Sequence, residues 1–215
     1  MPTARDDRTD SRQARRRRLT RQALIAATRE LISEKDVSEV RISEITTRAD
    51  VALGSFYNHF TAKEDAVEAV VAVTLRSVAT DIMGAALRIP DPLEAVAVAQ
   101  RRFIELAWTE PATARLLVHL DRAHALFETA LAPHLREGVS RGVSAGVFRG
   151  RGLDVTIIAT VGATLAIMRA IIDGRVGREA AAHSAEHLLL ALGVDPRTAA
   201  EVAGRPLTGT AEAMS

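Results

Sequence analysis

The sequence contains no cysteine and few aromatic residues. Without cysteine, the chain can form neither a disulfide framework nor a thiolate metal site. Aromatic residues make up 3% of its 215 residues, whereas alanine, leucine, arginine and glutamate are abundant. This composition predicts an all-α fold. The hydrophobic content of 47% is enough to bury a core in one or two domains.

Neither a secretory signal nor a membrane span is evident. The N-terminus is arginine-rich and no apolar stretch follows it, which is unlike a signal peptide. The longest nearly apolar run, the 14 residues 155–168, is too short to cross a bilayer and predicts a buried helix. We therefore expect a cytoplasmic protein without a membrane partner.

The chain as a whole has almost no excess of positive or negative charge, since its net charge is +1. The basic residues are concentrated at the front, where residues 1–21 hold eight arginines against three aspartates, a net charge of +5. Such an excess fits contact with nucleic acid. We expect residues 1–19 to form a disordered basic arm, either simply solvated or able to contact phosphates or a minor groove when DNA binds.

The stretch ISEITTRADVALGSFYNHFTAK predicts two short helices joined by a tight turn. The helices span residues 42–49 and 53–59, and Asp50 lies at the turn, where aspartate tolerates a left-handed backbone. The second helix has only about two turns and carries many polar side chains, so it is not stable alone. Its apolar side, with Phe56 and Phe60, must therefore be packed, and its polar side must meet a partner.

This stretch resembles the helix-turn-helix of the TetR family of bacterial transcriptional regulators. The spacing G-x-x-Y-x-H-F-x-x-K is specific, whereas beyond the first third of the chain only the all-helical layout is similar. The residues that carry the resemblance are Ile42, Ile45, Ala49, Val51, Gly54, Ser55, Phe56, Tyr57, His59, Phe60 and Lys63.

The resemblance implies a set of DNA contacts around the second short helix. Ala52, Leu53 and Ser55 lie nearest the bases, and other members of the set hold the backbone. The full set is Arg41, Ala52, Leu53, Gly54, Ser55, Tyr57, Asn58, His59 and Lys63. Leu53 replaces a frequent lysine and can contact a thymine methyl instead of a phosphate. Some members have simpler alternatives: a packing ring for Tyr57, a helix-capping or solvated histidine for His59, and a solvated lysine for Lys63.

Two helix starts depend on capping residues. Arg41 stands where the family often has serine or threonine, and it cannot accept a hydrogen bond from helix amides. The cap could shift to Ser43, leaving Arg41 free to reach a phosphate. Thr61 and Glu64 have the spacing of a capping box, which predicts a helix from about Ala62 toward residue 87.

The remaining helices form a larger body, about nine helices in total with the head. Asp-Pro and Glu-Pro pairs at residues 91–92, 110–111 and 195–196 mark helix starts. The expected domains are a basic arm at 1–19, a helix-turn-helix domain at 20–64, a ligand-binding and dimerisation domain at 65–204 and a flexible tail at 205–215.

The helices predicted at 155–173 and 178–192 are apolar on more than one face and need more than one partner. By resemblance, these helices 8 and 9 form a four-helix interface between two copies. The resemblance also implies a pocket for a small, partly apolar molecule in the body, with Arg169 or His119 as its polar anchor. The candidate lining residues are Phe103, Trp108, His119, His124, Phe127, Met168 and Arg169. Each can equally be an ordinary core residue.

Enzyme motifs are poorly supported. The H-x-x-E-H pattern of His183 and His187 is that of a zinc peptidase, but no downstream acidic ligand has a clear context and the pair falls on the expected dimer helix. We interpret both as interface residues. His119, Asp121 and His124 do not share one helical face. We therefore expect no catalysis, no cofactor and no metal site.

The predicted function is that of a homodimeric, DNA-binding repressor on a near-palindromic operator, released by an unknown small-molecule effector. The ligand would act by binding the released state more tightly, with the helix after Thr61 as the lever. The alternatives are a ligand-independent regulator or an activator and, from another class, a helical enzyme or ligand carrier.

Overall fold

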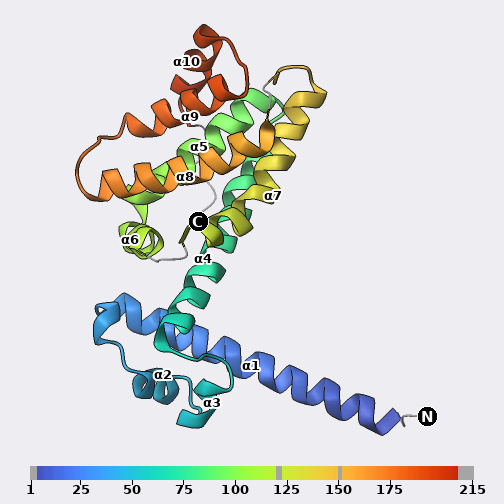
Figure 1. Cartoon of the computed structure of the whole chain (residues 1–215), viewed down its shortest axis with the longest axis vertical. Coiled ribbons are helices and arrows are strands. Elements are labelled where there is room, and N and C mark those ends of the chain that lie inside the picture. The colour runs from blue at the N-terminus through green and yellow to red at the C-terminus, as the bar shows by residue number, and fades with distance from the viewer. Residues whose placement is uncertain (1–3, 120–122, 150–151, 208–215) are drawn as a thin grey trace. The chain divides into compact units, whose positions relative to one another are not determined.

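The computed structural model describes residues 4–119, 123–149 and 152–207, without the side chains of residues 4–12, 112, 116, 119, 123–124 and 126–128. The described residues form ten α-helices and one short 3-10 helix, η1, and contain no strand (Figure 1). The all-α prediction is confirmed. The helices are α1 Ala4–Glu34, η1 Val37–Glu39, α2 Ile42–Arg48, α3 Leu53–Tyr57, α4 Lys63–Leu87, α5 Pro92–Thr109, α6 Pro111–His119, α7 Ala123–Ser144, α8 Leu153–Ile172, α9 Ala180–Ala191 and α10 Pro196–Gly204.

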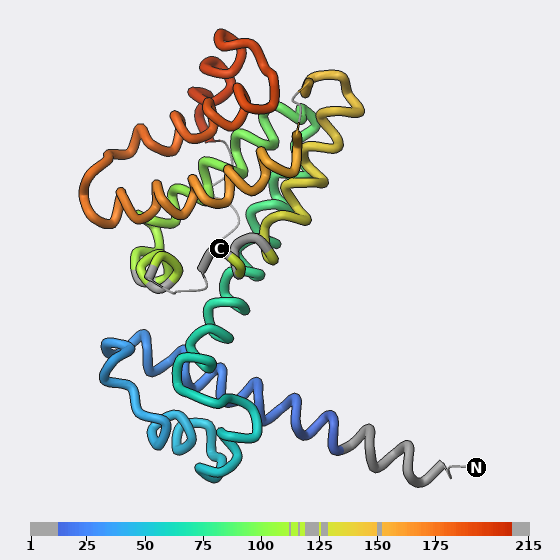
Figure 2. The backbone as a smooth tube through the Cα atoms, in the orientation of Figure 1, coloured from blue at the N-terminus to red at the C-terminus, as the bar shows by residue number. Residues whose placement is uncertain are grey.

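The chain divides into two compact units, Met1–Val73 and Thr74–Ser215. The division falls inside α4, nine residues after the boundary expected at residue 64. The first unit packs α2 and α3 beside the C-terminal half of α1 (Figure 2). Its buried core residues are Leu24, Ile25, Ala27, Leu31, Val40, Ile45, Phe56, Phe60, Ala66, Ala69 and Val70.

The N-terminal segment differs from the expectation of a disordered arm, because α1 begins at Ala4 rather than near Thr20. Residues 4–34 contain neither glycine nor proline and are rich in arginine, alanine, glutamine and leucine, which are strong helix formers. Three aspartates lie within its first seven residues, where negative charge complements the helix dipole. Local propensity therefore extends the helix well beyond the part that packs on a core.

The turn between α2 and α3 confirms the role predicted for Asp50, whose φ is 53°. The helix α2 begins at Ile42 as predicted, and the alternative cap at Ser43 is not used: Arg41 is the N-cap and makes no side-chain capping bond. Instead, the Glu44 carboxylate accepts a hydrogen bond of 2.9 Å from the Arg41 backbone N–H. Glu44 thus supplies its half of a capping box, the bond to the N-cap N–H, while the acceptor that serine or threonine would provide at residue 41 is missing.

The predicted capping box of Thr61 and Glu64 is also wrong. The helix α4 begins at Lys63, and Asp65 accepts hydrogen bonds from the backbone N–H groups of Thr61, at 2.8 Å, and Ala62, at 3.1 Å. The Thr61 hydroxyl donates to the same oxygen. Because the helix begins one residue later than expected, Asp65 rather than Glu64 occupies the third helical position.

In the second unit, α5 is the central helix and packs against α6, α7, α8, α9 and α10. Residues 95–100 of α5 are all buried. Its start is capped as predicted, since Asp91 accepts a hydrogen bond of 3.0 Å from the Leu93 N–H and Pro92 opens the helix. A core cluster with α9 and α10 contains Val96, Ala97, Val139, Phe148, Ala185, Leu188, Leu189, Leu192, Val194, Ala199, Val202 and Ala203.

A buried polar trio joins three helices of this unit. The side-chain amide of Gln100 on α5 donates to the hydroxyl of Ser184 on α9, at 2.7 Å, and of Thr164 on α8, at 3.1 Å. All three side chains are buried. Because a buried polar group costs free energy when its partners are lost, these bonds favour one relative position of α5, α8 and α9.

Two helices among the described residues, α4 and α8, are long and apolar enough to cross a membrane by length and composition alone. The helix α8 has 20 residues, so counting residues 155–168 alone underestimated it. It packs against α5, α6, α7 and α9, with Val161 and Met168 buried on that side. Only about a third of its most apolar 18 residues is buried, so α8 packs one face within the helical body and leaves apolar side chains such as Val155 and Ile158 exposed.

Candidate DNA-binding surface and helical body

The helix α3 is held from beneath by aromatic packing. Phe56 is fully buried, and its ring centroid lies 5.5 Å from that of Phe60. Tyr57 packs edge-on against Phe56, with 5.6 Å between centroids, yet keeps 57% of its surface exposed. Leu53, at the start of α3, is 53% exposed. The assignment of Phe56 and Phe60 to the core is confirmed, and the opposite side of α3 is free for a partner.

The predicted DNA contacts fall mostly on this free side. Six of them are exposed: Arg41, Ala52, Leu53, Gly54, Tyr57 and Asn58. Ser55 and His59 are half-buried. A Cβ atom placed on Gly54 would meet no atom within 4 Å, so packing inside the protein does not require glycine there.

Lys63 differs from its neighbours in the set, because its ammonium is engaged within the protein. Its Nζ donates to the backbone oxygens of Val37, at 2.9 Å, and Ser38, at 3.3 Å. These carbonyls belong to η1, so Lys63 ties the start of α4 to the connection between α1 and α2. A phosphate contact by Lys63 stays a prediction, and it would have to share or break these bonds.

Ion pairs fix α2 against α1. Arg48 donates to the two carboxylate oxygens of Glu34, at 2.8 and 3.1 Å, and this bond lowers the pKa of Glu34. Lys35 likewise donates to both oxygens of Glu44, at 2.7 and 2.8 Å, and lowers the pKa of Glu44. Each of these two ion pairs contains two hydrogen bonds. Together they orient α2 and, through the turn, the helix α3 that follows it.

A polar groove between α1 and the end of α3 is a feature that the sequence interpretation missed. It consists of two adjoining hollows that share Gln13, Arg17 and His59. Burial lowers the pKa of His59, and the positive charges of Arg17 and Arg21 lower it further. The spacing of the two arginines, four residues apart on one helical face, was the available signal, but it indicates a groove only if α1 is a helix there.

The predicted ligand residues do not meet around one described cavity. Phe103 and Met168 are buried. Trp108 is half-buried, and the guanidinium of Arg178 lies 5.5 Å from its ring centroid. Arg169, expected as a polar anchor, donates to the backbone oxygen of Val118. The side chains of the other candidates lie outside the described residues, namely His119, His124 and Phe127.

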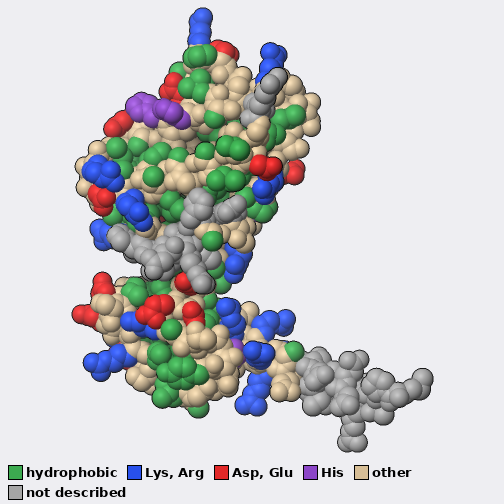
Figure 3. Space-filling view, in the orientation of Figure 1, with side chains coloured by type: hydrophobic (Ala, Val, Ile, Leu, Met, Phe, Trp, Pro, Cys, Tyr) green, Lys and Arg blue, Asp and Glu red, His purple; other side chains and the backbone are tan. Residues whose placement is uncertain are grey.

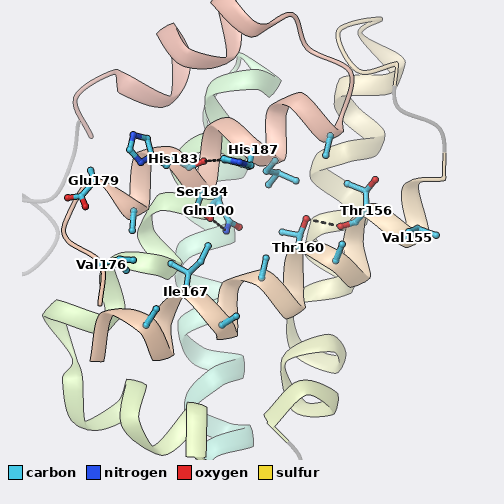
Figure 4. A pocket seen from close by; sticks show the side chains of 17 residues that line it. Gln100, Val155, Thr156, Thr160, Ile167, Val176, Glu179, His183, Ser184 and His187 are labelled. Carbon is cyan, nitrogen blue, oxygen red and sulfur yellow. Dashed lines mark hydrogen bonds between the residues drawn. The ribbon is translucent and has the colours of Figure 1, made fainter. Parts of the chain in front are cut away.

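A strongly apolar hollow lies elsewhere, between α8 and α9, with a volume of about 650 Å³. Figure 4 shows Gln100 and Ser184 at its floor, Thr160 and Ile167 along α8, and His183 and His187 along α9. None of the four predicted ligand residues with described side chains lines it. This groove occupies the helices that were expected to form a dimer interface rather than a ligand pocket.

The two histidines of the peptidase-like pattern lie on the rim of this groove. The Nδ1 atom of His187 lies 2.8 Å from the backbone oxygen of His183, a contact in which Nδ1–H is the donor. Among the described residues, no three histidine, aspartate or glutamate side chains come together as a metal site would require.

The first unit is a helix-turn-helix whose second helix exposes Leu53 and Tyr57, with the exposed Asn58 as its C-cap. The second unit is a helical body. Together they define a helix-turn-helix DNA-binding protein with an attached helical domain. Residues 24–70 match the family model described as bacterial regulatory proteins, tetR family, and residues 91–205 match the Tetracyclin repressor-like C-terminal domain. The chain belongs to the TetR family, and it is a DNA-binding transcriptional regulator.

Solved structures agree with this family. RolR in complex with resorcinol is 28% identical, with a TM-score of 0.81 over 91% of this chain and 98% of that chain. RolR without ligand is 27% identical, with a TM-score of 0.78 over 86% and 97%. FadR from Bacillus subtilis in complex with stearoyl-CoA, at 16% identity, shares the fold, with a TM-score of 0.58 over 79% and 98%. No curated protein matches the chain significantly.

Proposed function

We propose that the chain is a homodimeric repressor that places the α3 helices of two protomers in successive major grooves of a near-palindromic operator, and that a small molecule bound in the Thr74–Ser215 unit releases it. The observation that supports DNA contact most directly is the exposure of α3. Leu53 and Tyr57 are more than half exposed although both are large apolar or aromatic side chains. Half-sites would lie roughly 34–36 Å apart.

The DNA contact is tested by fluorescence anisotropy with a duplex selected by the wild-type protein from a random library. We expect Tyr57→Ala and Leu53→Ala to weaken binding, and Leu53→Ala to relax the preference for thymine at one position. Leu19→Ala is the matched control, because Leu19 on α1 is 51% exposed. If all three variants bind like the wild type and remain folded, α3 is not the reading helix.

The dimer is proposed to form through α8 and α9. Supporting this, Val155 and Ile158 on α8 are 71% and 47% exposed, and Figure 3 shows hydrophobic side chains gathered along this face of the body. We expect Ala163→Glu on α8 to produce monomers in analytical ultracentrifugation, whereas Ala200→Glu on α10 leaves dimers. Both alanines are exposed in the protomer. Dimers in both variants would exclude α8 from the interface.

The effector is proposed to be a small, partly apolar molecule bound among α5, α6, α7 and α8, near the buried Phe103 and Met168. The resorcinol bound by RolR makes this compound the first one to test. Trp108, the single tryptophan, lies in this unit and provides a fluorescence signal. We expect resorcinol or a related phenol to change this fluorescence and to lower DNA affinity.

The alternatives lead to different results in the same assay. A ligand-independent regulator would bind DNA equally with and without every compound tested, and an activator would raise rather than lower transcription from its own operator. We propose a non-enzymatic, cytoplasmic role, since the protein must reach DNA. Peptidase activity that is lost in His187→Ala would contradict the first part of that proposal.

A further inference from the structure

The arginine-rich part of α1 precedes the segment that defines the family's head. The family model begins at residue 24, whereas α1 begins at Ala4. Residues 13–23 contain five arginines and no acidic residue. All five arginine side chains are exposed, and Figure 3 shows Lys and Arg side chains gathered along the described part of this helix. This helical extension is thus a strongly basic surface.

The extension forms one wall of the groove that ends at α3. Gln13, Arg17 and Arg21 are four residues apart and lie on one face of α1. The opposite wall holds Asn58 and His59. The two adjoining hollows have volumes of about 680 and 720 Å³, which is ample for phosphate groups and their water. Among the described residues that line the two hollows, Asp50 is the one acidic side chain.

One arginine of the groove is already fixed in place. The guanidinium of Arg21 lies 5.1 Å from the ring centroid of Phe60, a residue that is only 4% exposed. A guanidinium held over an aromatic face loses less freedom when an anion binds. Arg21 is therefore a positioning cation at the inner end of the groove, and Arg17 stands one turn further out.

We propose that the groove between α1 and α3 holds backbone phosphates of the DNA beside the half-site, so that the helical extension is a second DNA-contacting element. This inference rests on the proposed binding of DNA through α3. Duplex DNA is the occupant that the site favours, because the groove continues directly from the reading helix. Its arginine forks, histidine ring and amide are also the groups that hold phosphate oxygens.

The test compares Arg17→Ala with Arg15→Ala. Arg15 is two residues away, faces about 200° around the helix, is exposed and lines neither hollow. Both substitutions remove one positive charge from the same turn and keep a good helix former, so helicity measured by circular dichroism should stay unchanged. The probe is the duplex selected by the wild-type protein, titrated over a range of salt concentrations.

We expect Arg17→Ala to lower affinity about tenfold near 0.15 M salt and to reduce the slope of log affinity against log salt by about 1. Arg15→Ala should lower affinity less than about twofold, because its effect is only long-range and screened. Equal losses in the two variants would overturn the inference, since general positive charge would then explain both.

Phosphate ethylation interference locates the contact. With wild-type protein, we expect one or more phosphates flanking the half-site to be needed for binding, and ethylation of at least one of them should no longer matter for Arg17→Ala. Identical interference patterns would overturn the inference even if affinities differ. Failure of the wild-type protein to select any duplex would instead contradict the proposed function itself.

Discussion

The close contact between Gly142 and Phe148 leads to a sharp prediction about stability. Gly142 lies near the end of α7, and a Cβ atom added there would overlap with ring carbons of Phe148. Phe148 is 3% exposed and packs with Leu188 and Leu192 near α9. We expect Gly142→Ala to force this ring out of position. The matched change Gly138→Ala, one turn earlier, meets only the Val96 side chain at 3.6 Å, an ordinary contact.

The magnitude follows from opposing terms. Replacing glycine by alanine inside a helix stabilises by about 0.5–1 kcal/mol. An overpacked core loses about 1–3 kcal/mol, and the partial exposure of a phenylalanine ring falls in the same range. Gly142→Ala should therefore destabilise by about 1–2 kcal/mol, and Gly138→Ala should stabilise by about 0.5–1 kcal/mol.

The assay is urea unfolding followed by the fluorescence of Trp108. One fixed protein concentration is used, because the proposed dimer would add stability by mass action. In a Phe148→Ala background the clash disappears, so Gly142→Ala should then be neutral or stabilising, with a coupling energy of about 2 kcal/mol. The reasoning is refuted if Gly142→Ala proves as stable as Gly138→Ala, or if its cost persists without the Phe148 ring.

Three further predictions concern the first unit, and thermal melts followed by circular dichroism check each of them. Asp50→Gly should stabilise by about 0.5 kcal/mol and Asp50→Val should destabilise by more than 1 kcal/mol, because the left-handed backbone favours glycine and strains β-branched residues; similar melts would show that the turn relaxes. Lys63→Met should cost about 1 kcal/mol through the lost bonds to Val37 and its neighbour, with no loss expected if those bonds do not persist in solution. Because burial and two arginines lower the pKa of His59 in the folded state, the unfolded chain binds more protons, and stability should fall as pH decreases from about 6.5; His59→Gln should flatten that slope, and an unchanged slope would assign it to other groups.

The head could be predicted from sequence because its signals are local. Asp50 at the turn, the aromatic pair of Phe56 and Phe60 and the Asp-Pro helix start at residues 91–92 each specify a backbone conformation or a buried face within a few residues. The family resemblance then assigned a DNA-binding function to these local features. The same local signals placed the start of α2 correctly at Ile42 but misplaced the start of α4, where Asp65 rather than Glu64 accepts hydrogen bonds from backbone amides.

The N-terminal extension shows the limit of composition. A run of arginines reads equally as a solvated arm or as a helix, because arginine is both highly charged and a strong helix former. The groove between this segment and His59 exists only if the segment is a helix. It could therefore not be predicted before the conformation of the segment was known. The basic charge of the segment was apparent, but the face on which Arg17 and Arg21 lie was not.

The body was less accessible to sequence reasoning. Aromatic and polar residues such as Phe103, Trp108 and Arg169 were candidates for a pocket because they are scarce and distinctive, but their neighbours are set by how α5, α6 and α8 cross. Trp108 pairs with Arg178 and Arg169 with a backbone carbonyl, and neither pairing has a signal at short sequence separation. The small residues along α8 and α9 that leave the groove open, such as Ala159, Ala163 and Ala180, have no individual sequence signal.

Because the N-terminal extension is helical, the direction in which each of its side chains points depends on the number of residues between that side chain and the head. Each residue of an α-helix advances about 1.5 Å and turns about 100°. Deleting the exposed Gln22 would therefore rotate Arg17 by about 100° away from His59 while leaving the charge of the segment intact. A flexible arm would absorb such a deletion. In a continuous helix, insertions and deletions preserve the orientation of the arginines only near whole turns, so the number of residues before the head matters as much as their charge.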